Sequence, residues 1–542
     1  MIEIPVSLRD IVVTLPMIVI LAMSLIPVMM KVFNQNREPN GFVTLAYGVL
    51  GLAFAMGLVG SMYGVRHTAF SGAIVFDGLV FWSSLLILGA ALFAVCLGYR
   101  HIDQNQRQFS ESMFLTLGSV LGMLVLIMSN DLIVTFLGIE TMSLCLYILI
   151  AMSREEVLAK EAALKYFVLG SFASAIFLYG IALTYGTVGS TTFVDFATRS
   201  GDLLAEGNRL FYVALIFLVL GFAFKVSVFP LHFWTPDVYQ GSPTPVTAFM
   251  ATAVKAASFV AFLRLLQPGL VENPLGDGAA AAVDVLSGLA SEPRLATALS
   301  WLAVLTMTVG NAAALIQTDF KRILAYSSVS HSGYIMVGLI AAIVGSGYES
   351  AVTVVLYYLI SYSVMTLGAF AVVGVLERKW DRSISINDFK GLARKHPYMA
   401  AGLAIVMFSL AGVPPSLGFM GKFGLFSLAV ERDLYWLAVW GVLNSVIAVY
   451  YYLRPVVLMY MADPEFESSG ATSSGASISG SSIAMGGGGS AASAVAAAGS
   501  RAETIVNGST VLSLATLAVM ALLTIAMGLL ASPIFEAIRA SL

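Results

Sequence analysis

The sequence has almost no cysteine and no nucleotide-binding or metal-binding motif. Cys96 and Cys145 are the two cysteines in 542 residues, and both lie in apolar runs without a CxxC spacing or a Cys/His cluster. No G-x-G-x-x-G stretch opens a strand–helix unit. These absences argue against a disulfide scaffold, a zinc site and an iron–sulfur cluster. We therefore expect this chain to bind no cofactor and no metal.

Charged residues are also scarce, at 11% of the chain, against roughly a quarter in soluble domains. Hydrophobic residues make up 58%, and the mean hydropathy is +0.89. The net charge is −3, and no basic patch alternates with aromatic residues outside the apolar segments, so nucleic acid is not an expected partner. The composition predicts an integral membrane protein surrounded by lipids.

Apolar stretches of a length that spans a bilayer recur along the whole chain. None shows the short alternating pattern of a membrane barrel, so the predicted fold is an all-α bundle of about fourteen transmembrane helices. The first stretch is too long for a signal-peptide core, and we interpret it as the first span. The fourteen stretches are 11–32, 41–63, 74–98, 113–129, 131–152, 162–186, 209–229, 245–267, 297–317, 322–344, 351–376, 398–429, 434–461 and 508–532.

Basic residues are distributed unequally between the loops on the two sides. With the N-terminus outside, the inside loops contain residues such as Lys321 and Arg322 and the basic run 378–395. The outside loops then contain fewer basic residues. The positive-inside rule therefore predicts that both termini lie outside.

Three local patterns concern organisation rather than chemistry. Residues 466–500 are rich in Gly, Ser and Ala and low in charge, which predicts a flexible linker before the last helix. The glycine pairs Gly60/Gly64 and Gly118/Gly122 have the spacing for close helix contact. Asp237, in the polar turn "TPDVYQGSPTP", is expected to be a helix cap or a surface residue.

Five ionisable residues lie in or close to the predicted spans: Glu140, Lys165, Lys225, Lys255 and Lys422. A lysine at the centre of a membrane helix costs roughly 2.5–3.5 kcal/mol on insertion scales, so each one indicates a partner or a function. Glu140, Lys225 and Lys255 lie deep in their spans. Lys165 is nearer to one end, and Lys422 follows a Gly-Val-Pro-Pro break at 412–415.

Four of these residues also have a purely structural explanation that involves no proton transfer. Lys165 can extend to the membrane interface, Glu140 and Lys225 can form a static ion pair, and Lys422 can be solvated by carbonyls freed at the break. Lys255 has no acid close to it in the sequence.

The functional hypothesis is proton transfer. Burial favours the neutral form of a lysine and a nearby carboxylate favours its charged form, so a lysine between these influences can bind and release a proton. Moving one charge against 100 mV requires about 2.3 kcal/mol, which modest rearrangements of a pair can supply. We expect a Glu140–Lys225 pair to act as a switch, with Lys255 and Lys422 as later stations.

His331 is a candidate link between the lysines. It lies in "LAYSSVSHSGYIMVG", amid Ser327, Ser328, Ser330 and Tyr334, which predict a hydrogen-bonded water chain. A histidine satisfied within the core is the alternative.

The chain resembles the antiporter-like membrane subunits of respiratory complex I in three stretches. They read "FKVSVFPLHFWTPDVYQGSPTPVTAFMATAVKAASF", "QTDFKRILAYSSVSHSGYIMVGL" and "AGVPPSLGFMGKF". The run "HFWTPDVYQGSPTPV" is most similar to the subunit N branch of that family. The resemblance is strong over roughly 110–460.

This resemblance implies two inverted five-helix repeats, broken helices 7 and 12, and a proton channel without a redox centre. It assigns proton-transfer roles to Glu140 on helix 5, Lys165 on helix 6, Lys225 on helix 7, Lys255 on helix 8 and Lys422 on helix 12. The implied segments are 1–110 (helices 1–3), 111–270 (first repeat, helices 4–8), 295–461 (second repeat, helices 9–13), 462–507 (linker) and 508–542 (helix 14).

The resemblance also implies partners and a location. FMN, iron–sulfur clusters and quinone would be held by partner subunits of the membrane and peripheral arms, and the chain would lie in a bacterial inner membrane with both termini periplasmic. The expected function is proton translocation within an NADH:quinone oxidoreductase. A cation/proton antiporter subunit of a multi-component transporter and a structural membrane scaffold are the alternatives.

Overall fold

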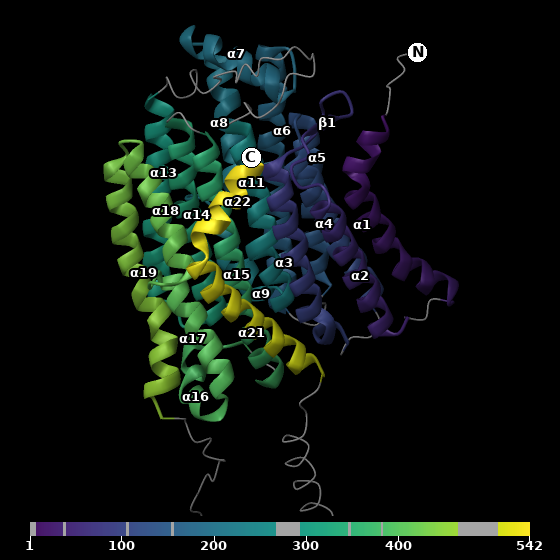
Figure 1. The fold of residues 1–542 in the computed structure, drawn as a ribbon, viewed down its shortest axis with the longest axis vertical. Coiled ribbons are helices and arrows are strands. Elements are labelled where there is room, and N and C mark those ends of the chain that lie inside the picture. Colours follow the sequence, from purple (N-terminus) through teal and green to yellow (C-terminus); the bar gives the residue numbers. More distant parts are fainter. Residues whose placement is uncertain are drawn as a thin grey trace, which may run out of the picture.

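The computed structural model describes residues 7–35, 39–103, 108–152, 157–266, 293–344, 348–380, 383–463 and 508–542. In these ranges the chain is a bundle of helices that run side by side (Figure 1). The described ranges contain one small sheet, in which β1 (His67–Ala69) pairs antiparallel with β2 (Ile74–Phe76). The predicted all-α membrane fold is confirmed. The predicted linker at 466–500 lies outside the described residues.

The first part of the bundle contains a surface helix and a series of apolar helices. In chain order these are α1 (Leu8–Phe33), α2 (Gly41–Gly60), α3 (Gly78–Asp103), α4 (Phe109–Met128), α5 (Leu132–Ala151), α6 (Val157–Val188), α7 (Phe193–Ala205), α8 (Arg209–Lys225), α9 (Trp234–Gly241), α10 (Thr244–Phe249), the π-helix η1 (Met250–Val254) and α11 (Lys255–Leu266). The surface helix is α7, which lies across one end of the bundle (Figure 1).

The second part begins after the next undescribed segment. It consists of α13 (Pro293–Leu315), α14 (Phe320–Val344), α15 (Tyr348–Trp380), the 3₁₀ turn η3 (Ile386–Phe389), α16 (Leu392–Lys395), α17 (Pro397–Ala411), α18 (Leu417–Glu431), α19 (Tyr435–Met461), α21 (Gly508–Leu529) and α22 (Ala531–Ser541). Helix α21 crosses the face of the bundle obliquely and packs on α15 (Figure 1).

Fewer helices qualify as complete spans than the fourteen expected. In the described part of the chain, eleven helices are long and apolar enough to cross a membrane, or twelve if α21 and α22, bent by 82°, form one span. The two predicted spans that fall short are 209–229 and 398–429, because the helix ends before the stretch does, at Lys225 in the first and at Ala411 in the second. The count of fourteen therefore stays a prediction.

Both interruptions occur at the predicted prolines. Helix α8 ends at Lys225, and a non-helical segment containing Pro230 separates it from α9. Helix α17 ends at Ala411, Gly412 adopts a left-handed φ of 88°, and α18 begins only at Leu417. Proline cannot donate a backbone hydrogen bond and clashes with the preceding turn, and glycine accepts the left-handed cap. The expected breaks in helices 7 and 12 are confirmed, and they free carbonyls inside the bundle to accept hydrogen bonds from other helices.

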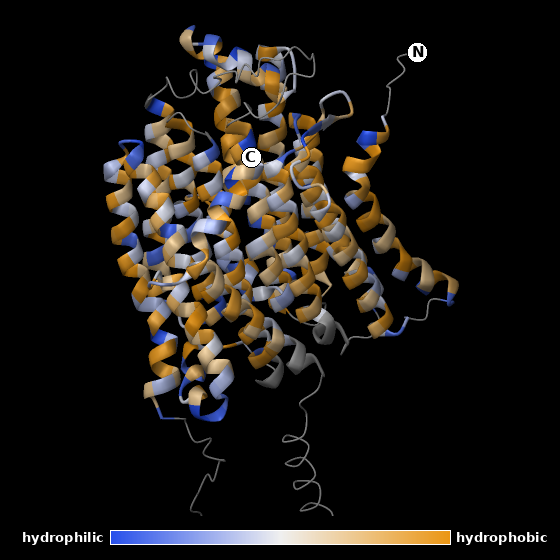
Figure 2. Cartoon of the chain, in the orientation of Figure 1, coloured by the Kyte–Doolittle hydropathy of each residue, from blue (hydrophilic) through white to orange (hydrophobic). Residues whose placement is uncertain are grey.

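The outer surface is apolar along the helices. Figure 2 shows hydrophobic residues over most of the helix lengths and hydrophilic residues gathered mainly at the two ends. Large apolar side chains such as Phe172 and Leu522 are exposed. Lipid acyl chains are the natural contact for such a surface.

The two ends of the described chain are tied to the same loop. Asp10 near the start of α1 pairs with His67 of β1 at 2.8 Å. Arg66, the preceding residue, donates to the backbone oxygen of Leu542. The start of α1 and the end of α22 therefore lie on the same side of the bundle.

Glycine spacing predicted helix contact correctly in one of two pairs. A Cβ at Gly122 of α4 would lie 2.4 Å from the backbone nitrogen of Met142 and 3.0 Å from the carbonyl oxygen of Gly138, both on α5. The Gly60/Gly64 prediction is wrong, because among the described residues no atom lies within 4 Å of a Cβ built at either position.

Gly122→Ala is expected to destabilise the protein. The new methyl group meets backbone that cannot rotate away, so α4 and α5 must separate, at a cost of about 1–3 kcal/mol. The thermal unfolding midpoint of the purified protein measures this. Gly57→Ala is the matched control, since a Cβ there meets no atom within 4 Å in the described structure. Equal midpoints for the two variants would contradict the prediction.

A buried network of lysines and hydroxyl groups

Glu140 and Lys225 lie in the same region but are not in direct contact. Lys225, the last residue of α8, is 5% exposed, and its Nζ donates to Ser143 Oγ of α5 at 2.7 Å. Glu140, one turn earlier on α5, instead accepts a hydrogen bond from Ser174 of α6. The expected direct ion pair is therefore absent between these two described residues. The carboxylate is nevertheless close enough to act on the lysine electrostatically.

Lys255 is held by one face of α14. Its Nζ donates to the Ser328 carbonyl at 2.6 Å and to Ser332 Oγ at 2.9 Å, and it also contacts Ser328 Oγ. The ring of Tyr362 lies 5.3 Å from the ammonium group. Three oxygens therefore accept hydrogen bonds from the three N–H donors of this buried ammonium group. They stabilise its charge although no acid lies close to it in the sequence. The π-turn η1 ends immediately before it, and such turns are frequent at functional sites.

The break in the first broken helix connects these two lysines. Ser332 Oγ, which contacts Lys255, also donates to the Val226 carbonyl at 2.5 Å. Val226 directly follows Lys225 and caps α8, so its carbonyl has no partner within that helix. The end of α8 thus places the carbonyl of Val226, the residue after Lys225, one hydroxyl away from Lys255.

His331 is bound by two tyrosines that sequence reasoning missed. Its Nδ1 is 2.7 Å from the hydroxyl of Tyr358 on α15, and its Nε2 is 3.0 Å from the hydroxyl of Tyr452 on α19. Of the expected neighbours, Ser327 contacts Tyr452, whereas Tyr334 accepts a hydrogen bond from Asn311. Each tyrosine hydroxyl can donate or accept, so the imidazole can exchange which nitrogen carries the proton.

Lys422 is solvated by the second helix break. It is 5% exposed on α18, and its Nζ donates to the carbonyls of Leu410 at 2.9 Å and Ala411 at 3.4 Å, the last residues of α17. The Tyr334 ring lies 5.3 Å from the same group. These are the freed carbonyls that the sequence predicted. We call Glu140, Lys225, Lys255, His331 and Lys422, with the hydroxyl groups they contact, the buried polar network.

Lys165 lies outside the buried polar network. Its side chain on α6 is 40% exposed and forms ion pairs with Glu161 at 2.6 Å and Asp237 at 2.8 Å. Asp237 also pairs with Arg322 of α14 at 2.8 Å. Asp237, in the first turn of α9 with its side chain 35% exposed, therefore also bridges α6, α9 and α14, which the sequence did not predict.

Two buried ion pairs were not predicted. Arg264 Nη2 of α11 is 2.9 Å from an Asp77 carboxylate oxygen, with the two side chains 1% and 9% exposed. Lys321 Nζ is 3.0 Å from Glu377 Oε1. Lys321 was placed in a loop because the predicted span begins at residue 322, but it is 5% exposed. Pairing between distant helices leaves no local sequence signal.

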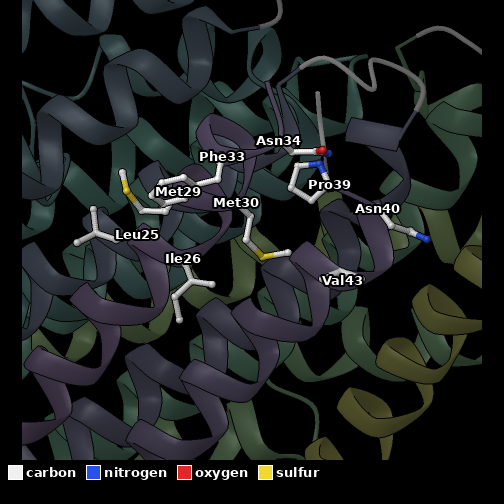
Figure 3. A pocket seen from close by; sticks show the side chains of 9 residues that line it. All are labelled: Leu25, Ile26, Met29, Met30, Phe33, Asn34, Pro39, Asn40 and Val43. Carbon is white, nitrogen blue, oxygen red and sulfur yellow. The ribbon is translucent and has the colours of Figure 1, made fainter. Parts of the chain in front are cut away.

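The described residues also contain an apolar cavity away from this network. It has a volume of about 650 Å³ and lies between the end of α1 and the start of α2 (Figure 3). Leu25, Met29 and Phe33 are among its apolar lining residues, with Asn34 and Asn40 as polar ones. Its lining contains no ionisable side chain, so it offers no site for proton transfer. Among the described residues, no three His, Cys, Asp or Glu side chains gather as metal ligands.

Comparison with known proteins places this network in a family context. The sequence matches the family described as NADH:quinone oxidoreductase/Mrp antiporter, TM, over residues 129–274 and 278–448. It is 43% identical to NADH-quinone oxidoreductase subunit N of Bdellovibrio bacteriovorus over 540 residues, which is 100% of both chains.

Solved structures of two membrane complexes contain chains with a similar fold. A chain of respiratory complex I from Thermus thermophilus matches with a TM-score of 0.72 and 29% identity, covering 97% of this chain and 100% of that one. A chain of the Mrp complex from a Dietzia species matches with a TM-score of 0.75, covering 99% and 97%. At 19% identity, that second likeness concerns the fold alone.

Proposed function

The chain belongs to the NADH-quinone oxidoreductase subunit N family, and from this premise we propose that its buried polar network carries protons across the membrane. It is a multi-span, antiporter-like membrane subunit of the respiratory enzyme complex I. In the proposal, Glu140, Lys225, Lys255, His331 and Lys422 are the groups that bind and release protons. Lys165 contributes at the partly exposed end of α6 through Asp237.

The observation that carries this proposal is the surroundings of three lysines. Lys225, Lys255 and Lys422 are each 5% exposed or less, and the hydrogen-bond partners of their ammonium groups are hydroxyl and carbonyl oxygens. Neutral oxygens stabilise the ammonium form less than a carboxylate does, so each lysine can lose its proton. A buried lysine that served only packing would be an expensive substitute for an apolar side chain.

Proton movement along the network follows from its connections. The Val226 carbonyl and Ser332 link the Lys225 region to Lys255, and His331 lies on the same helix as Ser332. Tyr334, also on α14, presents its ring to Lys422. Displacement of the Glu140 side chain relative to Lys225 changes how strongly Lys225 holds its proton. We infer that such a displacement, driven by quinone reduction elsewhere in the complex, starts each transfer.

We further propose that this subunit performs no redox step itself. With two cysteines and no dinucleotide motif, its sequence lacks ligand sets for the electron carriers. FMN, iron–sulfur clusters and quinone then belong to partner subunits. The chain assembles with other membrane-arm and peripheral-arm subunits of complex I.

Orientation and internal organisation are part of the same proposal. The distribution of basic residues favours both termini on the periplasmic side of a bacterial inner membrane. The end of the bundle where α6 and α14 begin and α15 ends then faces the cytoplasm, and we call it the inner end. We keep 111–270 and 295–461 as two inverted repeats, with 1–110, 462–507 and 508–542 as additional segments.

A cation/proton antiporter subunit is the alternative. The likeness to the Mrp complex favours it only at the level of the fold, whereas identity over the whole chain favours the respiratory enzyme. A purely structural scaffold is the third candidate.

Lys225→Ala is expected to reduce coupled proton pumping and quinone reductase turnover severalfold. The change removes the ammonium group that Ser143 holds, while the small side chain leaves α8 intact. Membrane vesicles energised with NADH measure pumping, and a native gel checks assembly. Lys160→Ala, which removes an exposed lysine at the start of α6, is the control. Unchanged pumping in a fully assembled Lys225→Ala complex would favour the scaffold.

A further inference from the structure

The buried pair Lys321–Glu377 joins three helices at the inner end. Lys321 is the second residue of α14, and its Nζ lies 3.0 Å from Glu377 Oε1 of α15. The same Nζ donates to the Ser242 carbonyl at 3.0 Å. The hydroxyl of Thr244, at the start of α10, donates to the other oxygen of the carboxylate. The pair is therefore enclosed by the segment that leads to Lys255.

Lys321 lies on the same face of α14 as the two serines that hold Lys255. Ser328 and Ser332 follow it by seven and eleven residues, spacings that return to one side of a helix. At 1.5 Å per residue, Ser328 is about 10 Å further along the helix axis. The pair is thus about two turns from Lys255, on the line that connects Lys255 with the inner end.

Polar groups occupy the space between the pair and Lys255. The Ser242 carbonyl, which Lys321 contacts, also accepts from Thr247 Oγ1 at 3.3 Å. The same hydroxyl is 3.1 Å from the Tyr239 carbonyl, and the Tyr239 side chain lies close to Ser328. Buried hydroxyl and carbonyl groups therefore continue from Lys321 to the serine that binds Lys255.

The two ends of this line differ in their access to water. The side chain of Glu377 is 17% exposed, whereas Lys255 is 2% exposed. Asp319 lies close enough to Lys321 and Glu377 to interact with their charges, and its carboxylate accepts a hydrogen bond from Gln240. Water at the inner end can therefore reach the Glu377 carboxylate but not Lys255.

We propose that the Lys321–Glu377 pair passes protons between the aqueous phase at the inner end and Lys255. This inference rests on the proposed function, because it requires that Lys255 exchange protons during turnover. Lys321 gives a proton to water among the Thr247 and Tyr239 hydroxyls, from which it reaches a Lys255 that has released its own proton toward His331. Glu377 takes a proton from bulk water and gives it to Lys321, so the pair returns to its starting charges. One proton has then moved from the inner end to Lys255.

Three variants in the assembled complex test the assignment. Glu377→Gln keeps the size of the side chain but cannot carry a proton, and we expect NADH-driven pumping to fall at least about fivefold, since a positioned proton-transfer group contributes substantially to rate. Glu377→Asp remains titratable and should keep more than about half of the pumping rate, with a shifted pH profile. Lys321→Met/Glu377→Gln leaves no unpaired buried charge and should stay as slow as Glu377→Gln. Glu111→Gln, in the Lys31–Glu111 pair between α1 and α4, is the matched control.

Specific outcomes would overturn the inference. A purely structural pair predicts recovery in the double variant, because replacing both buried charges by neutral groups is often tolerated. It also predicts that Glu377→Asp, whose shorter side chain draws the carboxylate away from Lys321, is as impaired as Glu377→Gln. Lys255→Met is measured in parallel. Loss of pumping in Lys255→Met with normal pumping in Glu377→Gln refutes this inference alone, whereas normal pumping in Lys255→Met refutes the proposed function.

Discussion

In the assembled complex, Lys255→Met is expected to lower NADH-driven proton pumping to about a tenth or less, because a correctly placed proton-transfer group contributes about a hundredfold or more. Methionine fills a similar volume but leaves Ser328 and Ser332 without the ammonium group that both contact. The line between the inner end, Lys225 and His331 is then interrupted at its centre. Quinone reductase turnover should fall with it, since the two processes are coupled.

The control for this experiment is Thr252→Ala. Thr252 is fully buried three residues before Lys255, and its hydroxyl donates to the Ala248 carbonyl of its own helical turn at 2.7 Å. It therefore tests whether any polar loss at this depth impairs the protein. Pumping should remain near the wild-type rate in Thr252→Ala. If Lys255→Met assembles and still pumps at the wild-type rate, Lys255 is not a proton carrier.

The largest expected effect on stability comes from Asp77→Asn. The carboxylate of Asp77 neutralises Arg264, and its Oδ1 also accepts from the Val80 nitrogen at the start of α3. Asparagine keeps that cap but leaves a guanidinium group, 1% exposed, without its counter-charge in the described part of the chain. Breaking a buried pair in this way costs about 3–5 kcal/mol. We expect a lower unfolding midpoint and less assembled complex on native gels.

An exposed pair of the same chemistry provides the comparison. Arg394 and Asp463 also approach to 2.8 Å, but their side chains are 64% and 87% exposed. Asp463→Asn should change the free energy of unfolding by about 0–1 kcal/mol, because water already solvates both charges. Similar midpoints for Asp77→Asn and Asp463→Asn would show that burial does not strengthen the Asp77–Arg264 pair.

Local sequence signals located the lysines of the site but not their partners. The freed carbonyls around Lys422 were predictable, because the Gly-Val-Pro-Pro break and the lysine that its carbonyls solvate lie within about a dozen residues. The Glu140–Lys225 pair was predicted from similar depth in the membrane. In the structure, however, Lys225 donates to Ser143, and Glu140 accepts from Ser174. Opposite charges at similar depth do not determine which side chains face each other, since rotation of one helix changes the partner.

The sequence by itself determined the membrane fold, the two helix breaks and the depth of the ionisable residues. Each of these depends on properties that residues carry with them: the cost of charge in lipid, the missing donor of proline, and the length of an apolar run. Only the tertiary structure decided that His331 lies between Tyr358 and Tyr452 and that Lys321 is buried against Glu377. Those contacts join helices far apart in the chain, and they form only when packing fixes how each helix is rotated about its axis.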